Sequence, residues 1–574
     1  MKNIAKFAFV GMLIALATTA ANADVRVTAN IATSTTWTAG NVYNLVGQIY
    51  VLPGATLTIE AGTLVQSVVA DQGSLAVCRG AKIYVNGTKA APVIMTSKLD
   101  TLTAWHEGCN EWGNLTIMGK GLISASHYGG LPVGSNTKTP TGLNEKAMEG
   151  LTAGTGYSIM YGGNDDNDDS GSIHYLSLRY GGKVLGLANE LNGLSLGGIG
   201  RETDIDHVEI INNVDDGIEI WGGTVNLKYF SIWNIGDDSL DIDEGWRGKA
   251  QFGLIVQGYS TNASQGSGVG DNCIEMDGAE DSDAQPVTTG VIYNCTVIGQ
   301  PFDGDHATAW RDNARVQLRN SIFMDMGERL VQLDNTDGDG GSAYGYNGTL
   351  SWAATWTTPY TATSTVNAGT WTAGAFNDPA MLYKAQTSGT LCEISDCVFY
   401  NNLYASAYTE ADARGVRAAA NNNVTATVSP IQGLTRAATV TRGGKQMQQV
   451  TNINPCPAND ALTSVNTAPV DGFFAPVKFR GAFSATNNWL AGWTAVDAYG
   501  MTVTTMNAAD PVATLTMTAS TSFPTVAGVV YTVESSTDMK NWSPIGTVIG
   551  DGSTMSVTDL KNYESAKFYR AIRQ

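Results

Sequence analysis

Basic side chains are scarce in this sequence of 574 residues, which has 33 lysines and arginines against 53 aspartates and glutamates. The formal net charge is −20, and it becomes about −22 without the first 23 residues, which hold two of the lysines. Nucleic-acid binding depends on Lys and Arg neutralising phosphates, so this balance argues against a nucleic-acid partner. It fits a protein that stays soluble through self-repulsion or that collects divalent cations.

Long hydrophobic runs are also lacking beyond the start of the chain, and no later run is long enough to cross a bilayer. The one apolar stretch, Phe7–Ala17, follows two lysines and precedes the small residues Ala21–Ala23. This order is typical of a secretory signal peptide. We therefore expect residues 1–23 to be removed on export, leaving a mature chain with no transmembrane span. No cysteine follows the predicted cleavage site, which argues against a lipid-modified N-terminus.

The sequence has only seven cysteines. Because this number is odd, at least one of them is unpaired or pairs with another chain. Cys392 and Cys397 are close enough in sequence to join across one turn, and Cys78 and Cys109 form a second candidate pair. Such bridges would add little to stability, because a chain of this length can bury ample surface without them.

What the sequence does have is a repeat with an interval of 22 residues. Two sets of segments follow this interval: Val208–Ile210, Phe230–Ile232 and Phe252–Leu254, and Asp215–Ile220 and Asp237–Ile242. Within each unit apolar residues alternate with small or polar ones, as in a strand with one buried face. A fixed interval near this length indicates a solenoid whose turns bury their apolar faces by stacking on one another. The sequence thus predicts an all-β fold, a right-handed parallel β-helix in which Phe230 stacks against Phe252.

Changes in composition separate this predicted β-helix, residues 24–500, from its insertions and from a C-terminal module. Loop insertions are expected near residues 127–160, 337–390 and 405–471, where the apolar alternation is lost. The third insertion carries most of the local positive charge, so it either folds back over the acidic coils or forms a disordered loop. Residues 510–574 alternate cleanly and predict a small antiparallel β module of the sandwich type.

Several segments carry a resemblance to known proteins: Gly54–Thr63, Trp112–Ile117, Gly222–Phe252, Phe479–Phe483 and Asn488–Thr494. In these segments the chain resembles a widespread group of exported bacterial β-helix surface proteins whose biochemistry is unassigned. The module with Tyr531–Asp538 and Asn541–Trp542 resembles a small domain found at the ends of secreted bacterial proteins. The resemblance implies a fold and an exported location, and it implies no activity.

Acidic residues recur at matching positions of neighbouring repeats. Glu219 lies between two core isoleucines and is expected to point outward; Asp241 takes its place one coil later, and Glu275 continues the row. Stacked strands lie about 4.8 Å apart, so such carboxylates either share protons or bind a cation. Hard oxygen ligands in this number suit Ca²⁺. The predicted Ca²⁺ ligands are Asp215, Asp216, Glu219, Asp237, Asp238, Asp241, Asp243 and Glu275. The alternative is a hydrated acidic face without an ion.

Two further acidic loops, Asn164–Asp169 and Asp334–Gly340, are either Ca²⁺ sites or solvated turns. Neither has the Glu that an EF-hand loop needs at its twelfth position.

Signatures of catalysis are few. A glycoside hydrolase needs two carboxylates about 5 to 9.5 Å apart, one of them protonated. The carboxylates that could serve are Asp216, Glu219, Asp238 and Asp241. However, the Arg-x-Pro-x-x-Arg run of pectate lyases and the Gly-His-Gly and Arg-Ile-Lys elements of polygalacturonases are missing. His174, His207 and His306 are isolated, with no Cys or His at metal-ligand spacing.

Four tryptophans, Trp221, Trp233, Trp246 and Trp310, offer either a sugar-stacking surface or cover for coil edges. Taken together, we expect an exported, non-catalytic protein of the cell surface or extracellular matrix. It would act in adhesion, or bind a polysaccharide or cell-surface glycan, through a rigid acidic face that holds Ca²⁺. A polysaccharide lyase or hydrolase and a purely structural envelope component are the alternatives. The sequence does not indicate an oligomeric state.

Overall fold

The computed structural model describes residues 23–124, 145–186, 189–259, 270–278, 286–312, 314–333, 354, 356–359, 389–402, 421–442, 444–458, 465–503, 519–536, 540, 542–559 and 568–573. Residues 1–22 of the predicted signal peptide and most of the insertion predicted at 337–390 lie outside this set. The chain divides into two compact units, Met1–Asn507 and Ala508–Gln574.

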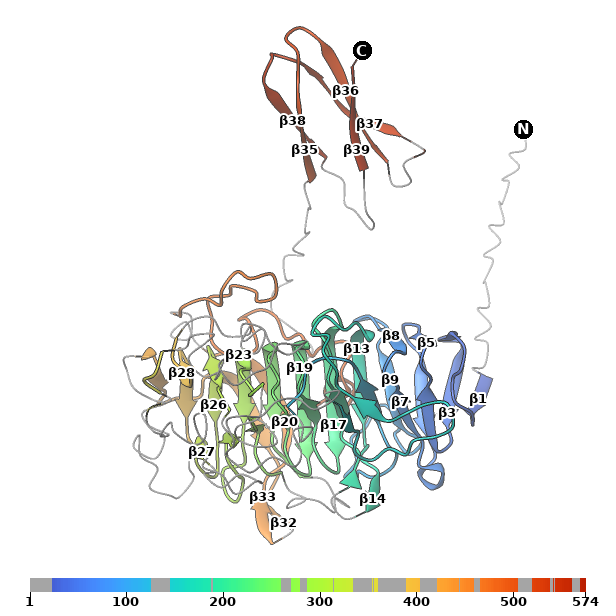
Figure 1. Cartoon of the computed structure of the whole chain (residues 1–574). Coiled ribbons are helices and arrows are strands. Elements are labelled where there is room, and N and C mark those ends of the chain that lie inside the picture. The colour runs from blue at the N-terminus through green and yellow to red at the C-terminus, as the bar shows by residue number, and fades with distance from the viewer. Residues whose placement is uncertain are drawn as a thin grey trace, which may run out of the picture. The chain divides into compact units, whose positions relative to one another are not determined.

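Parallel strands stacked coil upon coil build the first unit, as the row of arrows between β1 and β28 in Figure 1 shows. One face of the coils is a nine-stranded parallel sheet. Its strands, in spatial order, are β4 (Gln48–Val51), β7 (Ser74–Val77), β10 (Leu115–Met118), β16 (Leu194–Gly197), β18 (Ile218–Trp221), β20 (Leu240–Asp243), β22 (Ile274–Met276), β24 (Thr308–Trp310) and β27 (Val331–Leu333). The predicted fold class, a parallel β-helix, is confirmed.

A seventeen-stranded sheet forms the remaining faces of the coils. Its strands are β1 (Ala23–Val27), β2 (Thr35–Trp37), β3 (Asn41–Leu45), β5 (Thr56–Ile59), β6 (Leu64–Ser67), β8 (Lys82–Asn86), β9 (Val93–Ser97), β13 (Gly171–Arg179), β17 (Asp204–Asn213), β19 (Asn226–Ile235), β21 (Lys249–Val256), β23 (Val291–Ile298), β25 (Gln317–Arg319), β26 (Ile322–Met324), β28 (Glu393–Ser395), β29 (Val398–Tyr400) and β30 (Val424–Thr425). The longer strands serve two faces: β13 pairs with β8 through its first half and with β9 through its second half.

A residue with left-handed backbone bends each long strand between these two faces. In β13, β17, β19 and β21 this residue is Tyr175 (φ 50°), His207 (52°), Tyr229 (57°) and Phe252 (63°). Bulky side chains rarely adopt this conformation. Here their rings stack in one column, with centroids 4.1 Å apart for Tyr175 and His207, 4.5 Å for His207 and Tyr229, and 4.9 Å for Tyr229 and Phe252. We infer that this ring stacking offsets the backbone strain at the corner.

The register of Phe252 differs from the prediction. Phe230 lies opposite Gly253, not opposite Phe252, because the turn between β20 and β21 holds one residue more than the turn before it. Gly253 suits this position, since a Cβ added there would lie 2.2 Å from the Phe230 ring. The 22-residue interval holds between β17 and β19, where Val208 pairs with Phe230. The prediction that Phe230 stacks on Phe252 was therefore wrong.

Aliphatic residues from all faces fill the interior of the coils, for example Leu57, Leu115, Ile218 and Ile232, each 0 % exposed. All seven cysteines are buried, and no two of them are joined in a disulfide. The bridges considered between Cys392 and Cys397 and between Cys78 and Cys109 are therefore absent. The packed interior stabilises the coils without them.

Shorter elements project from the coils or cover them. They are η1 (Val69–Asp71), α3 (Ala495–Ala498) and four antiparallel partners in two pairs, β11 (Lys146–Ala147) with β12 (Met160–Tyr161) and β14 (Val184–Gly186) with β15 (Asn189–Glu190). The insertion predicted at 127–160 is described only from residue 145, one residue before β11 begins.

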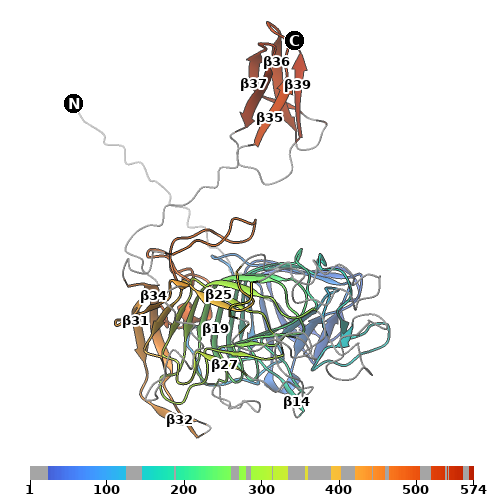
Figure 2. The ribbon, with the colours of Figure 1, turned by 60° about the vertical axis from the view of Figure 1, so that its left-hand side comes forward.

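Part of the insertion predicted at 405–471 folds back onto the coils (Figure 2). It forms two antiparallel pairs, β31 (Ile431–Arg436) with β34 (Val450–Pro457) and β32 (Val440–Arg442) with β33 (Lys445–Met447). Its basic residues meet carboxylates of the coils: Arg436 lies 2.9 Å from Asp325, Arg442 2.8 Å from Glu107 and Lys445 3.4 Å from Asp305. Of the two interpretations left open, the described residues show the first.

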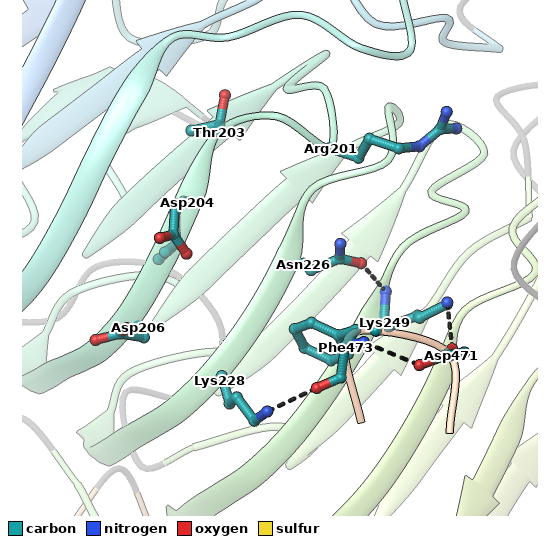
Figure 3. Close-up of a pocket in the computed structure, with 11 residues that line it drawn as sticks. Arg201, Thr203, Asp204, Asp206, Asn226, Lys228, Lys249, Asp471 and Phe473 are labelled. Carbon is teal, nitrogen blue, oxygen red and sulfur yellow. Dashed lines mark hydrogen bonds and ion pairs between the residues drawn. The ribbon is translucent and has the colours of Figure 1, made fainter. Parts of the chain in front are cut away.

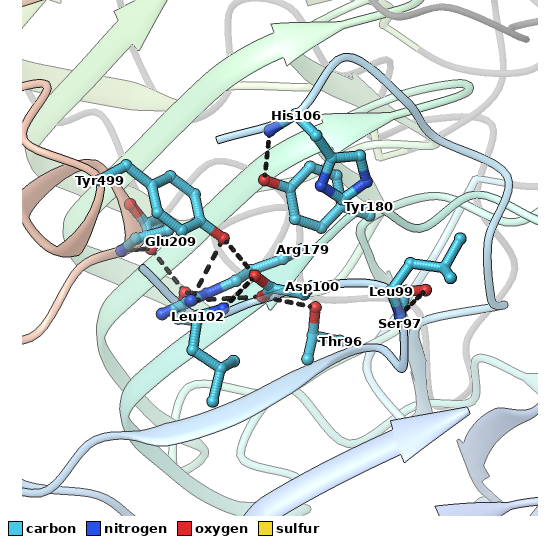
Figure 4. Close-up of polar contacts among 12 residues, drawn as sticks. Thr96, Ser97, Leu99, Asp100, Leu102, His106, Arg179, Tyr180, Glu209 and Tyr499 are labelled. Carbon is cyan, nitrogen blue, oxygen red and sulfur yellow. Dashed lines mark hydrogen bonds and ion pairs between the residues drawn. The ribbon is translucent and has the colours of Figure 1, made fainter. Parts of the chain in front are cut away.

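A buried polar network joins the coils to the segment after this insertion (Figure 4). Arg179, 1 % exposed, lies 3.4 Å from Asp100 and donates a hydrogen bond to the Tyr499 hydroxyl at 3.3 Å. Its Nε donates to Ser177, whose hydroxyl donates to Glu209 at 2.6 Å. Glu209 is fully buried, and burial raises its pKa. Because a buried carboxylate needs donors, Glu209 also accepts the two backbone N–H groups at the start of α3 at 2.6 and 3.2 Å.

The second unit is a small antiparallel β module. Its strands form two sheets, β35 (Ala519–Pro524) with β38 (Thr554–Asp559), and β37 (Ser543–Ile549), β36 (Val530–Ser536) and β39 (Phe568–Arg573) in that order. Tyr531 and Val533 alternate inward on β36, with 8 % and 0 % exposure. The antiparallel architecture predicted for the C-terminal module is confirmed.

The buried network makes the first testable prediction. Arg179→Met leaves two buried carboxylates without their cation, and we expect the free energy of unfolding of the β-helix to fall by about 3–5 kcal/mol. Denaturant titration followed by circular dichroism measures this loss. Arg26→Met is the matched control: the Arg26 side chain is 62 % exposed and lies 3.6 Å from Asp71, so we expect a change below about 1 kcal/mol. Equal effects of the two substitutions would contradict the role assigned to Arg179.

Candidate functional site

The predicted acidic row lies on the outer side of the nine-stranded sheet. Glu219 of β18 is paired with Asp241 of β20, and Asp241 with Glu275 of β22. The row is neutral at both ends, at Ser195 before it and Ala309 after it. The register predicted from the repeat therefore brings these three carboxylates together on adjacent strands.

A second column runs through the turns that enter these strands. The Asp216 carboxylate accepts the backbone N–H of Asp238 at 2.9 Å, and the Asp238 carboxylate accepts the backbone N–H of Asn272 at 2.5 Å. Before them, the Asn192 side chain accepts the N–H of Asp216 at 3.3 Å and donates to Glu219. Each of these side chains thus accepts a backbone N–H from the turn of the next coil. This explains why an Asp or Asn occupies this position in every one of these repeats.

Three carboxylates of the two columns are buried, contrary to the hydrated face that was one of the two interpretations. Asp216 and Glu219 are each 8 % exposed and Asp238 is 6 % exposed. Asp241 is half-buried, and its Oδ1 is a buried atom without a hydrogen-bond partner among the described residues. The side chains point away from the core of the coils, and those of Asp216, Glu219 and Asp238 are almost closed off from solvent.

Burial, followed by repulsion from neighbouring carboxylates, raises the pKa of Asp216, Glu219, Asp238 and Asp241 well above the usual range. Within the part of the chain that the structure describes, no Lys, Arg or His lies within ion-pair distance of these four groups. Arg311 lies 3.5 Å from the next carboxylate along, Glu275. The four groups therefore either hold protons or face a cation from outside the chain.

The ligand atoms of two overlapping triads lie close enough for one ion. Oxygens of Asp216, Glu219 and Asp241 lie within 4.8 Å of one another, and so do oxygens of Asp215, Asp216 and Asp237. Asp238 instead serves a turn of the backbone, Asp243 accepts the N–H of Glu244, and Glu275 pairs with Arg311. The predicted set of eight ligands is thus narrowed to five that form triads. Carboxylate oxygens in this arrangement fit a hard cation such as Ca²⁺.

The first of the two other acidic loops is a structural ion-pair site. Asp166 is 3 % exposed, and Arg247 donates two hydrogen bonds to its carboxylate. Asp169 pairs with Lys82, and Asp168 accepts from Ser170 at 2.9 Å. Asp166 and Asp168 are thus buried and hydrogen-bonded within the chain, whereas Asn164, Asp165 and Asn167 are exposed, as a solvated turn requires. The second loop, residues 334–340, lies outside the described residues.

The four tryptophans do not form a sugar-stacking surface. Trp233, Trp246 and Trp310 are 0 % exposed and Trp221 is 6 % exposed. The indole N–H groups of Trp233, Trp246 and Trp310 donate to Ser231, to the Val225 carbonyl and to Thr308, as buried indoles require. The alternative role, covering coil edges, agrees with this burial.

The three histidines are isolated in the sequence, but the structure shows that each of them contacts a carboxylate. Asp206 lies between His174 and His207, 3.2 Å from one ring and 2.7 Å from the other, and these contacts hold its pKa well below the usual range despite burial. His306 lies 3.1 Å from Glu328 and also contacts Asp305. His174 and His207 are 33 residues apart in the sequence because the coil between β13 and β17 is long. No short sequence motif therefore indicated that they lie close together.

A pocket of about 580 Å³, which the sequence did not announce, opens on the outer side of the seventeen-stranded sheet (Figure 3). Its floor is formed by the first halves of β17, β19 and β21, and one wall by Asp471–Phe473. The charged residues that line it are Arg201, Asp204, Asp206, Lys228, Lys249 and Asp471. The wall and the floor are more than 200 residues apart in the chain, which is why sequence reasoning missed the pocket.

Residues 29–390 match the family described as the pectate-lyase-like β-helix domain. The match covers more than half of the chain, so the chain belongs to this family. The resemblance to β-helix proteins noted in the sequence is confirmed. No curated protein matches the sequence.

Among solved structures, the chain is similar to the full-length tailspike protein 2 of Escherichia coli O157:H7 bacteriophage CAB120. The two sequences are 10 % identical, and the match covers 93 % of this chain and 61 % of the tailspike, with a TM-score of 0.17. At this TM-score the likeness carries no argument about function. No helix among the described residues is long and apolar enough to cross a membrane.

The raised pKa values predict a stability that falls with rising pH. The folded chain holds protons on its buried carboxyls that the unfolded chain releases above about pH 4, so the free energy of unfolding decreases from there up to the raised pKa values. Glu219→Gln and Asp216→Asn each remove the contribution of one of these carboxyls to the pH dependence of the free energy of unfolding. In a chelating buffer at pH 8 we expect each variant to be more stable than the wild type by about 1 kcal/mol or more, and the gain to vanish near pH 4.

Thermal melting followed by circular dichroism between pH 4 and 8 measures this difference. Glu60→Gln, at an exposed position, is the control and should leave the pH profile unchanged. Parallel profiles for Glu219→Gln and the wild type would show that the ladder does not titrate.

Proposed function

We propose that this chain is an exported, non-catalytic protein of the cell surface or extracellular matrix that acts in adhesion or glycan binding. In this proposal a rigid acidic face of the β-helix binds Ca²⁺ and is stabilised by it. The observation that carries the proposal is that, among the described residues, no Lys, Arg or His lies within ion-pair distance of Asp216, Glu219, Asp238 or Asp241.

Ca²⁺ takes six to eight oxygen ligands and accepts flexible geometry. The two triads share Asp216, so one ion between them would draw on Asp215, Asp216, Glu219, Asp237 and Asp241. The Oδ1 atom of Asp241 is a buried acceptor with no partner among the described residues, and leaving such an acceptor unsatisfied is costly. A cation at this point would satisfy it and would offset the repulsion along the ladder.

The exported location is part of the proposal. It is supported by the predicted signal peptide at residues 1–23 and by the resemblance to exported β-helix proteins. The acidic balance of the chain favours a glycan or another surface molecule as partner over a nucleic acid.

A polysaccharide lyase or glycoside hydrolase is the second candidate. The observation that favours it is that oxygens of Asp216, Glu219 and Asp241 lie within 4.8 Å of one another. A retaining glycosidase holds its two carboxyl groups about 5–5.5 Å apart. Against it, Asp216 and Glu219 are each only 8 % exposed, so little of either side chain is open to a polymer. A purely structural envelope component is the third candidate.

Ca²⁺ should stabilise the folded chain. A ligand that binds the folded state at a hundredfold excess over its Kd adds about 2.7 kcal/mol to the free energy of unfolding. We expect the melting temperature at pH 7.5 to rise with added Ca²⁺ and to fall with a chelator, and we expect Glu219→Gln and Asp241→Asn to lose most of this response.

Asp169→Asn is the matched control for this experiment, because Asp169 is an acidic residue that already pairs with Lys82. It should keep the full response to Ca²⁺. A wild-type melting temperature that is the same with Ca²⁺ and with chelator means that the ladder holds protons and no ion.

Incubation with a panel of acidic and neutral polysaccharides separates the three candidates. The proposal predicts retention of the protein on at least one polysaccharide without new reducing or unsaturated ends. Product formation that disappears in Asp241→Ala would establish the enzyme instead. If the protein is not retained on any polysaccharide and forms no products, the purely structural role is supported.

A further inference from the structure

The pocket on the outer side of β17, β19 and β21 is separate from the acidic ladder, which lies on β18, β20 and β22 of the other sheet. Its volume of about 580 Å³ is within the range of small-molecule sites, about 300–1,000 Å³. In a chain with a net charge of −20, three basic side chains gather around it: Arg201, Lys228 and Lys249 (Figure 3). Three aspartates also line the pocket, and Lys249 and Arg201 already contact Asp471 and Asp166, so Lys228 is the cation that remains for an anionic group.

Lys228 is the central cation of the pocket. It is half-buried, and its ammonium donates one hydrogen bond, at 2.6 Å, to the Phe473 carbonyl. Among the described residues no carboxylate lies within ion-pair distance of it, and burial lowers its pKa. An ammonium has three donors, so two remain for a ligand. Asp206 and Asp471 act on Lys228 only at longer range, so a ligand anion would be its direct ion-pair partner.

The wall of the pocket is a fixed structure. The Asp471 carboxylate accepts the backbone N–H groups of Phe473 and Phe474 at 3.0 and 3.1 Å and pairs with Lys249. Phe474 packs on Tyr293, with ring centroids 4.7 Å apart. The half-buried Phe473 ring lies 5.0 Å from the Lys228 ammonium, so an aromatic face and a cation border the same space.

The donors and acceptors of the pocket alternate. Asp206 lies beside Lys228 on the adjacent strand, and Asp204 lies beside Asn226. A ligand with several negative charges, such as a phosphopeptide, would meet repulsion from Asp204 and Asp206. A sugar fits better, because its hydroxyls donate to carboxylates, its apolar face packs on an aromatic ring, and a single anionic substituent pairs with a cation.

We propose that this pocket binds one anionic sugar residue of a glycan, with the anionic substituent on Lys228 and the apolar sugar face on Phe473. The substituent is a carboxylate or a sulfate, which present the same charged oxygens to these donors. The inference names a site and a ligand class for the proposed glycan binding, and it does not depend on Ca²⁺ at the ladder.

Calorimetric titration of the full chain in chelating buffer tests this site. The probes are a hexuronic acid trisaccharide, the same trisaccharide with its carboxyls methyl-esterified, and a sulfated hexose trisaccharide. We expect an acidic probe to bind and the esterified probe to bind at least tenfold more weakly. Binding of the uronic acid or of the sulfated probe identifies the substituent. Because charge-assisted hydrogen bonds weaken with salt at exposed sites, the Kd should also rise with ionic strength.

Three variants place the binding in the pocket. Lys228→Met should raise the Kd about ten- to a hundredfold, since it removes a charge-assisted contact. Lys228→Arg should retain most of the affinity, and Phe473→Ala should weaken both acidic probes. Lys478→Met is the matched control, because Lys478 is exposed on the same segment and carries the same charge. Melting temperatures report whether each variant is folded.

Equal binding of the acidic and esterified probes, or unchanged binding by folded Lys228→Met, would overturn the pocket as the site. Glycan binding elsewhere would then still stand if the protein is retained on polysaccharide. Absence of binding to all three probes together with absence of retention would overturn both the pocket and the proposed glycan binding. Should Lys228→Met fail to fold, Phe473→Ala and Lys228→Arg decide the question.

Discussion

The structure depends on the stacking of parallel coils in register. Each coil adds a rung about 4.8 Å from the last, so a side chain is forced to lie next to those at the equivalent positions of its neighbours. Apolar columns such as Ile218, Leu240 and Ile274 gain burial from this arrangement. The aromatic corner column from Tyr175 to Phe252 gains ring stacking. A column of like charges, by contrast, is destabilised by the same geometry.

The size of this repulsion explains why the acidic ladder stands out. Two carboxylates about 4.8 Å apart repel each other by about 3.5 kcal/mol at an effective dielectric constant near 20. This exceeds the net contribution of a typical hydrogen bond, about 1 kcal/mol. Ser195 and Ala309 bound the row, and Arg311 pairs with its last member, Glu275. The uncompensated charge is thus confined to the coils of Glu219 and Asp241, where a proton or an ion must offset it.

How much of this could be read from the sequence depended on the length of the coils. Glu219 and Asp241 were predicted as neighbours because the repeat between them has its regular interval, and the structure agrees. Phe252 was assigned to the wrong neighbour because one residue was added in the preceding turn. The burial of Glu219 could not be predicted, since side-chain exposure depends on segments that the repeat does not describe. The Lys228–Phe473 pocket joins residues 245 apart, and no local pattern announces such a contact.

The distribution of the scarce basic residues gives the strongest indication of where the chain interacts with other molecules. Arg247, Arg436 and Lys445 form ion pairs with Asp166, Asp325 and Asp305, respectively. These ion pairs hold loops and the folded-back segment onto the coils. None of the described cations approaches Asp216, Glu219, Asp238 or Asp241 within ion-pair distance, and none of the described carboxylates lies within that distance of Lys228. In an isolated chain these opposite charges would stabilise the fold if they were paired. Among the described residues, their separation onto different sheets leaves four carboxylates without a cation at ion-pair distance and one ammonium without a carboxylate at that distance. External ions or ligands of opposite sign would satisfy both, and this complementarity is the physical basis for assigning them to binding.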